Sequence, residues 1–510
     1  MQRAYVFLGS GAVRLDCPRF FYEKKESLME KSTVLESVMR EFRALAAIPR
    51  PSGHEKAVSD YLLAHLQEMG LEVVQDERGN IIADLAATPG RENAPRVILQ
   101  GHMDMVCVAA PGVSYDPLQD AIELLEEGDM LRAKGTSLGA DDGIGVAIIL
   151  HILRHVTEHG PVRAIFTVDE ERGMTGAIHL EEKYLQDAQY LINCDSENLD
   201  ELCVGSAGGV DLTFSRTMKL VAAPGKSAWQ VAVGGLQGGH SGEEIGTGRA
   251  NALRLLSLTL AGLQEAGISF ALASLAGGKA KNAIASEAAA VIVTEASEEN
   301  LREALQGEEA KFRRTYSVTE PSLSLSLAKA LPVQQVIAAD DAANLLRILR
   351  LFHTGIYQMS ALTPGMVETS ANLGVVHMEG AEIDIDFYPR SSVEGKLFEF
   401  CCMAKDLAEL TGFSLHIGTI APSWDEDKAN PLAEVIAEAF ERRMGKPMKV
   451  ETIHAGLECG WFYRKNPQMK FVSVGVTTHD IHSPKESLDL PTVEPLVDIL
   501  SAALKKLAEH

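Results

Sequence analysis

Apolar runs of β-strand character recur along the chain, and four of them end in side chains that can bind metal ions. The runs are "RVILQGHMD" (96–104), "VRAIFTVDEE" (162–171), "QYLINCDSE" (189–197) and "KFVSVGVTTHDIHSP" (470–484). Helix-like segments such as "DDGIGVAIILHILRHV" (141–156) alternate with these runs. Strands that alternate with helices predict an α/β fold with a mostly parallel sheet covered by helices on both faces.

The ends of the four strands are expected to meet at one edge of this sheet, where ligands of open α/β sheets bind. His102 and Asp104 lie two residues apart at the end of the first run, so their side chains face the same space. A glycine-rich turn, "GTSLGADDGIG" (135–145), follows that run and opens a helix. Asp141 or Asp142 is either the N-cap of this helix or a carboxylate whose two oxygens bridge two cations.

The side chains at these ends include histidines and several carboxylates but no thiolate. Imidazole and carboxylate ligands suit zinc, and also manganese or cobalt. The four strand ends and the glycine-rich turn together supply at least five ligands. Five are too many for one tetrahedral zinc ion that keeps an open position. They suit two divalent ions about 3.5–4 Å apart that share a carboxylate and a water.

A long insertion separates the third strand end from the fourth. Alternating segments in it, such as "AWQVAVGGL" (228–236), "AAAVIVTEA" (288–296) and "EIDIDFYPRSS" (382–392), predict an α+β domain. We therefore expect a catalytic domain made of residues 29–208 and 421–510, with an inserted domain at 209–420. Residues 1–28 lack the apolar core of a signal peptide, and we expect them to form a disordered extension.

Composition and charge exclude several classes of function. The 510 residues are 46% hydrophobic and 23% charged, which is typical of a globular enzyme, and no apolar run is long enough for a membrane span. The net charge of −24 argues against nucleic acid and anionic membranes as partners. The seven cysteines are scattered without a C-x-x-C pair, which indicates a reducing compartment, and we expect a cytoplasmic protein.

The motifs together resemble those of a known family. "GHMDMV", "GTSLGADDGIG", "VDEERGMTG", "NCDSE", "GGLQGGHSG", "HAGLECG" and "HSP" are similar to the motifs of the dinuclear zinc aminoacylase/carboxypeptidase clan. Within that clan they are most similar to those of the bacterial Xaa-His dipeptidases. They occur in the same order as in that family, from about residue 40 to 505.

The resemblance implies a role for each matching residue. The metal ligands would be His102 and Asp195 for one ion, Glu171 and His482 for the other, and Asp141 as the bridge between both. Asp104 would orient His102 by accepting a ring N–H. Glu170 would be the general base that takes a proton from the bridging water. The resemblance also implies a cis peptide bond after Asp141.

The resemblance further implies that the inserted domain is a lid that carries the contact of a homodimer. His240, in "GGLQGGHSG", is by composition an exposed turn histidine, but the resemblance implies that it stabilises the developing oxyanion. Asn282, in "GGKAKNAIAS", would line the cleft. Arg390 is our candidate for binding the free carboxylate of a dipeptide, because a guanidinium matches a carboxylate bidentately.

We therefore expect metal-dependent hydrolysis of dipeptides, both Xaa-His and other unblocked dipeptides. The alternatives are another amidohydrolase of the clan, such as a tripeptidase or an N-acyl-amino-acid deacylase, and a metal-binding homologue without catalysis. Other candidates are set aside: we expect His151, His155 and His159 to lie on a solvated helix face, and His479 and Asp169 to lie outside the ligand set.

Overall fold

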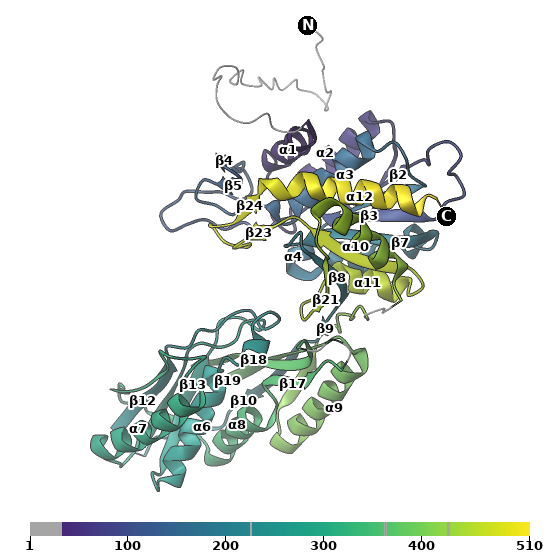
Figure 1. The fold of residues 1–510 in the computed structure, drawn as a ribbon. Coiled ribbons are helices and arrows are strands. Elements are labelled where there is room, and N and C mark those ends of the chain that lie inside the picture. The colour runs from purple at the N-terminus through teal and green to yellow at the C-terminus, as the bar shows by residue number, and fades with distance from the viewer. Residues whose placement is uncertain (1–32, 225–226, 362, 364, 426–428, 510) are drawn as a thin grey trace, which may run out of the picture.

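The computed structural model describes residues 33–224, 227–361, 363, 365–425 and 429–509. The predicted disordered extension, residues 1–28, lies outside these described residues. Figure 1 shows two bodies, each built on its own large sheet, with the chain passing between them near β9 (Gly208–Gly209).

An eight-stranded mixed sheet carries the four strands whose ends hold the predicted ligands. Its central pairs, β6–β3, β3–β7 and β7–β22, are parallel, whereas the β1–β2 and β2–β6 pairs at one edge are antiparallel. The predicted fold class, α/β with a mostly parallel mixed sheet, is confirmed. The strand order is β1 (Glu72–Gln75), β2 (Ile81–Leu85), β6 (Val162–Thr167), β3 (Arg96–His102), β7 (Ala188–Ser196), β22 (Lys470–Gly475), β8 (Glu201–Ser206) and β21 (Lys449–Ile453).

Helices cover both faces of this sheet because successive side chains of each strand point to opposite faces. Along β3, Val97 and Leu99 join the core with one helix layer, whereas Ile98 joins the core on the other face. The first layer contains α1 (Thr33–Ala46), α2 (Lys56–Glu68), α3 (Ala140–His155), α10 (Pro431–Met444) and α12 (Val493–Leu507). The second contains α5 (Thr175–His179) and α11 (Glu458–Lys465), and the short α4 (Glu170–Gly173) precedes α5.

A second, antiparallel sheet of ten strands lies between β8 and β21 along the chain. Four helices pack against it around a core of their own: α6 (Ala252–Glu265), α7 (Glu298–Thr315), α8 (Ala339–Leu351) and α9 (Glu394–Thr411). The strand order is β15 (Ser324–Lys329), β12 (Ser227–Gly234), β14 (Ala288–Thr294), β13 (Phe270–Gly277), β18 (Val367–Glu379), β19 (Glu382–Ser391), β10 (Leu212–Thr217) and β20 (Ser414–Ile417). β17 (Gly355–Met359) pairs with β18, and β9 pairs with β19.

The chain leaves and re-enters the first body at one place. Backbone bridges join Ser206 to Trp424 and Gly209 to Ala421, so the outgoing and returning segments run side by side. Two small sheets complete the described structure: β11 (Leu220–Ala222) with β16 (Gln335–Ile337), and β23 (Thr478–His479), β24 (Ser487–Asp489), β5 (Met130–Ala133) and β4 (Leu124–Glu127). Across the described residues, no helix combines the length and the apolar character that a membrane span requires.

The prediction that three histidines near α3 are solvated is wrong for His151 and His159 and right for His155. His151 is buried, because α1 packs across the helix at this point, and burial lowers the pKa of its imidazole to about 4. His159 is also buried and lies beyond the end of α3, where its Nδ1 is 2.7 Å from the carbonyl oxygen of Gly160. Only His155 lies on an exposed part of the helix.

Candidate active site

Asp141 lies between His102 and His482, which are far apart in the sequence. Its Oδ1 is 3.0 Å from Nε2 of His102, and its Oδ2 is 3.0 Å from Nε2 of His482. Nε2 of His102 is also 3.4 Å from Oδ1 of Asp195, and Nε2 of His482 is 2.9 Å from a carboxylate oxygen of Glu171. The five residues predicted as metal ligands therefore lie in one cluster.

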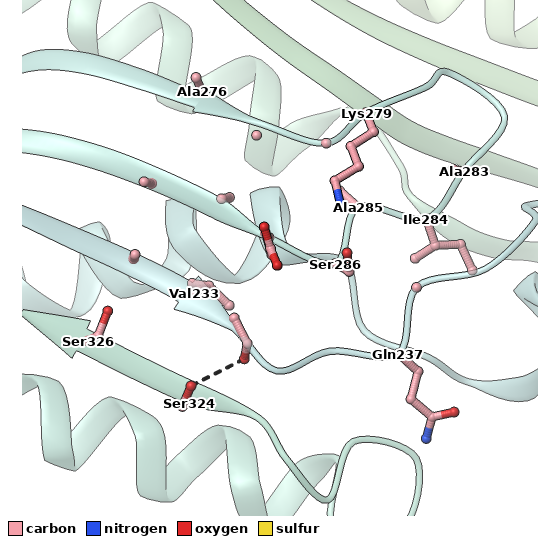
Figure 2. Close-up of a pocket in the computed structure, with 18 of the residues that line it drawn as sticks. Val233, Gln237, Ala276, Lys279, Ala283, Ile284, Ala285, Ser286, Ser324 and Ser326 are labelled. Carbon is pink, nitrogen blue, oxygen red and sulfur yellow. Dashed lines mark hydrogen bonds between the residues drawn. The ribbon is translucent and has the colours of Figure 1, made fainter. Parts of the chain in front are cut away.

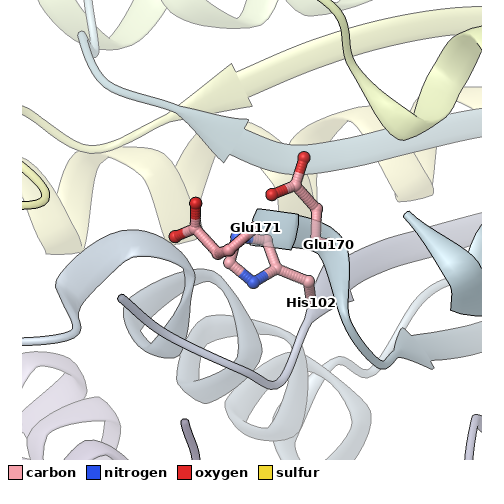
Figure 3. A group of neighbouring side chains, drawn as sticks. All are labelled: His102, Glu170 and Glu171. Carbon is pink, nitrogen blue, oxygen red and sulfur yellow. The ribbon is translucent and has the colours of Figure 1, made fainter. Parts of the chain in front are cut away.

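The ligand atoms of this cluster form groups of the size that a metal ion requires. In each group the atoms lie within 4.8 Å of one another. Two of the groups share Asp141, as expected for a bridging carboxylate. The third brings both glutamates of α4 to His102, and Figure 3 shows the two carboxylates beside its ring. The groups are His102, Asp141 and Asp195; Asp141, Glu171 and His482; and His102, Glu170 and Glu171.

Asp104 organises the two glutamates as well as lying beside His102. Its Oδ1 accepts the backbone N–H of Glu170 at 3.1 Å, and its Oδ2 accepts that of Glu171 at 3.3 Å. A carboxylate at the start of α4 thus takes N–H groups that have no partner within the helix. The same Oδ1 is 3.5 Å from Nδ1 of His102. One buried side chain therefore binds the backbone of the glutamate pair and lies beside His102.

The glycine-rich turn leads into an irregular start of α3, where Asp141 and Asp142 have non-helical backbone angles. Gly139 is the N-cap of α3, and no side chain caps the helix there. The peptide bond between Asp141 and Asp142 is cis, as the resemblance implied. Asp142 instead accepts the backbone N–H of His102 at 3.1 Å, a role that the sequence did not suggest.

The electrostatics at Asp141 favour its ionised form beside two histidines. Burial raises the pKa of Asp141, but the hydrogen bonds and charges of His102 and His482 outweigh burial and lower it. Burial lowers the pKa of both histidines, but the neighbouring carboxylates outweigh it, and the pKa of His482 is raised to about 11. Divalent cations would supply the positive charge that these carboxylates favour.

Three carboxyls of the ligand groups, Asp195, Glu170 and Glu171, have raised pKa values. Burial is the main cause for Asp195, whose pKa is raised to about 7. The pKa of Glu170 is raised by burial and by the charges of Asp195, Glu171 and Glu458. So many carboxylates in one buried place repel one another unless cations lie between them.

A layer of buried polar side chains crosses the sheet beneath the ligands. Asn193 donates to Gln100 at 2.7 Å, and Gln100 donates to Glu458 at 2.6 Å. Thr167 donates to the same Glu458 oxygen at 2.7 Å, and Ser473 donates to Asn193. These residues lie on β3, β6, β7, β22 and α11, so the layer holds the four ligand-bearing strands in register. The sequence did not predict this network.

Three residues predicted from the inserted region lie close together at the second sheet. They are His240, Asn282 and Arg390. Nη2 of Arg390 is 3.3 Å from Nε2 of His240, and the Arg390 guanidinium lies over the ring of Tyr388, 4.7 Å from its centre. The backbone N–H of Ser241 donates to the carbonyl oxygen of Asn282 at 2.8 Å. Arg390 is buried, whereas Asn282 is exposed.

The loop of His240 packs against the body that contains the eight-stranded sheet and the predicted metal ligands. A Cβ added to Gly242 would lie 2.9 Å from the carbonyl oxygen of His454, so the two backbones are in close contact. Glu243 lies 3.4 Å from Nδ1 of His240. The nearby imidazole of His240 lowers the pKa of Glu243, and the charge of His482 adds to this effect. The His240 loop is therefore within electrostatic reach of the ligand cluster.

A separate cavity lies away from this cluster. It has a volume of about 680 Å³ and is lined mainly by small side chains of β12, β13, β14 and β15 on the second sheet. Figure 2 shows Ser286, Ser324, Ser326 and Lys279 around it. It contains none of the predicted ligands.

His479 pairs with Asp489 at 3.3 Å, and Asp169 bonds to Arg172 and Thr175, so both lie outside the ligand groups as expected.

The chain matches the model of peptidase family M20/M25/M40 over residues 98–506. It is 34% identical over 469 residues to the cytosol non-specific dipeptidase of Escherichia coli strain K12, an alignment that covers 91% of this chain and 96% of that protein. The chain belongs to peptidase family M20/M25/M40. The family and the peptidase class predicted from the motifs are thus confirmed.

Solved structures agree with this family assignment. The M20/M25/M40 peptidase is similar to the aminoacylhistidine dipeptidase from Vibrio alginolyticus, with a TM-score of 0.81, 34% identity, and coverage of 92% of this chain and 96% of that one. An aminopeptidase PepT from Bacillus cereus, at 16% identity and a TM-score of 0.56 over 93% of this chain and 99% of that one, shares the fold.

Proposed function

We propose that this M20/M25/M40 peptidase hydrolyses unblocked dipeptides, Xaa-His dipeptides among them, with two divalent metal ions. The position of Asp141, shared by two ligand groups with a histidine in each, is the observation that carries the proposal. Imidazole and carboxylate donors without thiolate fit Zn²⁺, and also Mn²⁺ or Co²⁺. His102 and Asp195 would hold one ion, Glu171 and His482 the other, and Asp141 both.

Held by these residues, divalent ions would supply Lewis acidity, which lowers the pKa of a bound water and polarises a peptide carbonyl. Glu170 would take the proton from the attacking water and pass it to the leaving amine. The contacts support this division between the two glutamates. Glu171 lies against His482, whereas the ligand group that contains Glu170 does not include His482 or Asp141. Asp104 would keep His102 and both glutamates in place.

The second sheet would bind the carboxyl end of the dipeptide. Around Arg390, five buried polar atoms make no hydrogen bond to any described residue: Nε of Arg390, Nδ1 of His240, Oγ of Ser241, Oδ1 of Asn372 and Nδ1 of His454. Buried polar groups nearly always have a partner, so unpaired ones gathered in one place indicate a ligand. A carboxylate would satisfy the guanidinium, and Asn282 would line the entrance. His240 would donate to the developing oxyanion.

The inserted region at 209–420 would act as a lid on the catalytic residues 29–208 and 421–510. The contact between the His240 loop and His454 supports this, and it supports action of His240 within its own chain.

We also propose a cytoplasmic homodimer that associates through the second sheet. The E. coli relative is named a cytosol enzyme, which agrees with the cytoplasmic proposal. Light scattering of the purified protein measures the oligomeric state.

A C-terminal amide should be a much poorer substrate than the free dipeptide. The amide loses a charge-assisted hydrogen bond to Arg390 worth about 1.5–3 kcal/mol, so kcat/KM should fall about 10- to 100-fold.

Arg390→Ala should raise KM for the free dipeptide, and it should remove the preference over the amide. His240→Ala should mainly lower kcat, because its contact forms in the transition state.

Steady-state kinetics on an aminoacyl-histidine and its amide measure these effects. Equal kcat/KM values for the two substrates in the unaltered protein would show that the carboxylate is not recognised. Hydrolysis of N-acetyl amino acids is a separate assay, which tests the alternative of an N-acyl-amino-acid deacylase.

A further inference from the structure

Glu486 binds the loop that carries Asp141. Its side chain is 2% exposed, and its two oxygens accept four consecutive backbone N–H groups. Oε2 accepts from Leu138 at 2.8 Å and from Gly139 at 3.1 Å. Oε1 accepts from Ala140 at 2.8 Å and from Asp141 at 3.4 Å. A buried carboxylate is stable only when its oxygens are hydrogen-bonded, and here the start of α3 supplies the donors.

Arg50 holds the same loop through its carbonyl groups. The guanidinium is 2% exposed and donates to the carbonyl oxygen of Gly139 at 2.6 Å. It also donates to the carbonyl oxygens of Met103 and Asp104, at 3.1 and 2.9 Å, just after His102. Gly139 has a φ of 68°, and a Cβ added there would lie 2.6 Å from Nη2 of Arg50. The loop therefore passes between a buried cation and a buried anion.

Glu486 also belongs to the loop that carries His482. The two residues are four apart, and the backbone N–H of Glu486 donates to the carbonyl oxygen of Ser483 at 3.1 Å. The carboxylate of Glu486 thus ties the His482 loop to the Asp141 loop, although about 340 residues separate them along the chain. Both loops supply ligands to the ligand group of Asp141, Glu171 and His482.

We propose that Glu486 is a positioning residue that sets the separation of Asp141 and His482, with Arg50 holding the loop from the other side. It thereby controls the affinity of the second metal ion more than that of the first. The inference rests on the proposed two-ion site. The first ion depends less on Glu486, because His102 and Asp195 lie on strands of the eight-stranded sheet.

Glu486→Gln tests this role with little change in size. The amide keeps one acceptor oxygen and turns an NH₂ group toward backbone N–H groups, so part of the contact is lost. We expect the variant to bind one Zn²⁺ with an affinity that changes little and the second about 10- to 100-fold more weakly, as is typical when groups that support ligands are altered. Competition with a chromogenic chelator, starting from metal-free protein, measures both affinities without an activity assay.

Glu41→Gln is the matched control. Glu41 is a buried glutamate of α1 that pairs with His65 and Arg154, away from the strand ends. Its change should lower thermal stability without separating the two zinc affinities. The proposal is overturned if Glu486→Gln binds both ions as the unaltered protein does, or if both affinities fall equally. If Glu486→Gln does not fold, Glu486→Asp undergoes the same test with the same criteria. An unaltered protein that binds fewer than two ions contradicts the proposed function instead.

Discussion

Replacing Glu170 by glutamine is expected to lower kcat for dipeptide hydrolysis by about 10²- to 10⁴-fold, the usual contribution of a general base. Glutamine cannot accept the proton of the attacking water, but it keeps the size of the side chain. The backbone N–H that binds Asp104 is unchanged, so the fold of α4 and the metal content should persist. Turnover of an aminoacyl-histidine and metal analysis of the same preparation measure the two effects.

Glu171→Gln is the matched comparison, because it makes the same change one residue along the chain. Glu171 contacts His482, so this variant should lose affinity for one metal ion. Near-normal turnover in Glu170→Gln, or loss of metal from Glu170→Gln with retention in Glu171→Gln, would mean that the two glutamates have the opposite roles.

Asp141→Asn is expected to lower the affinity of the protein for both metal ions and to reduce the hydrolysis of dipeptides to background. Asp141 belongs to both ligand groups, one oxygen facing each histidine. The amide of asparagine is neutral and offers only one acceptor oxygen, so it cannot bridge two cations. Chelator competition should show weaker binding at two sites, in contrast to the single site expected to weaken in Glu486→Gln.

Asp169→Asn is the control for this change. Asp169 precedes the glutamate pair and bonds to Arg172 and Thr175, outside the ligand groups. It has a φ of 58°, a conformation that asparagine also tolerates. This variant should keep both ions. An Asp141→Asn variant with two tightly bound ions would contradict the bridging role.

Local patterns in the sequence were sufficient to predict the ligand-bearing strands. The apolar runs that end at His102 and Glu171 form β3 and β6, which pair in parallel. A polar residue directly after a buried run marks a strand end, and parallel strands place their carboxyl ends at one edge of the sheet. The residue roles within the cluster came from the resemblance, because strand spacing does not distinguish Glu170 from Glu171.

Contacts between distant segments could not be predicted in this way. Arg50 and Glu486 act through backbone groups of residues 138–141, and a backbone contact leaves no pattern in the sequence of either partner. Glu458 likewise acts on Gln100, more than 300 residues away. His151 was assigned to the wrong environment because the sequence pattern does not show that α1 packs over α3. A helix that is apolar on most sides, as α3 is, indicates burial more reliably than the spacing of its histidines.

The central claim is that two metal ions on a shared aspartate enable dipeptide hydrolysis. Metal-free protein titrated with Zn²⁺, while hydrolysis of an aminoacyl-histidine is followed, tests it most directly. We expect binding of two ions per chain, with activity that is absent at the start, rises with occupancy and is abolished again by a chelator. Full hydrolysis by the metal-free protein, or a chain that binds no ion at the Asp141 cluster, would contradict the claim.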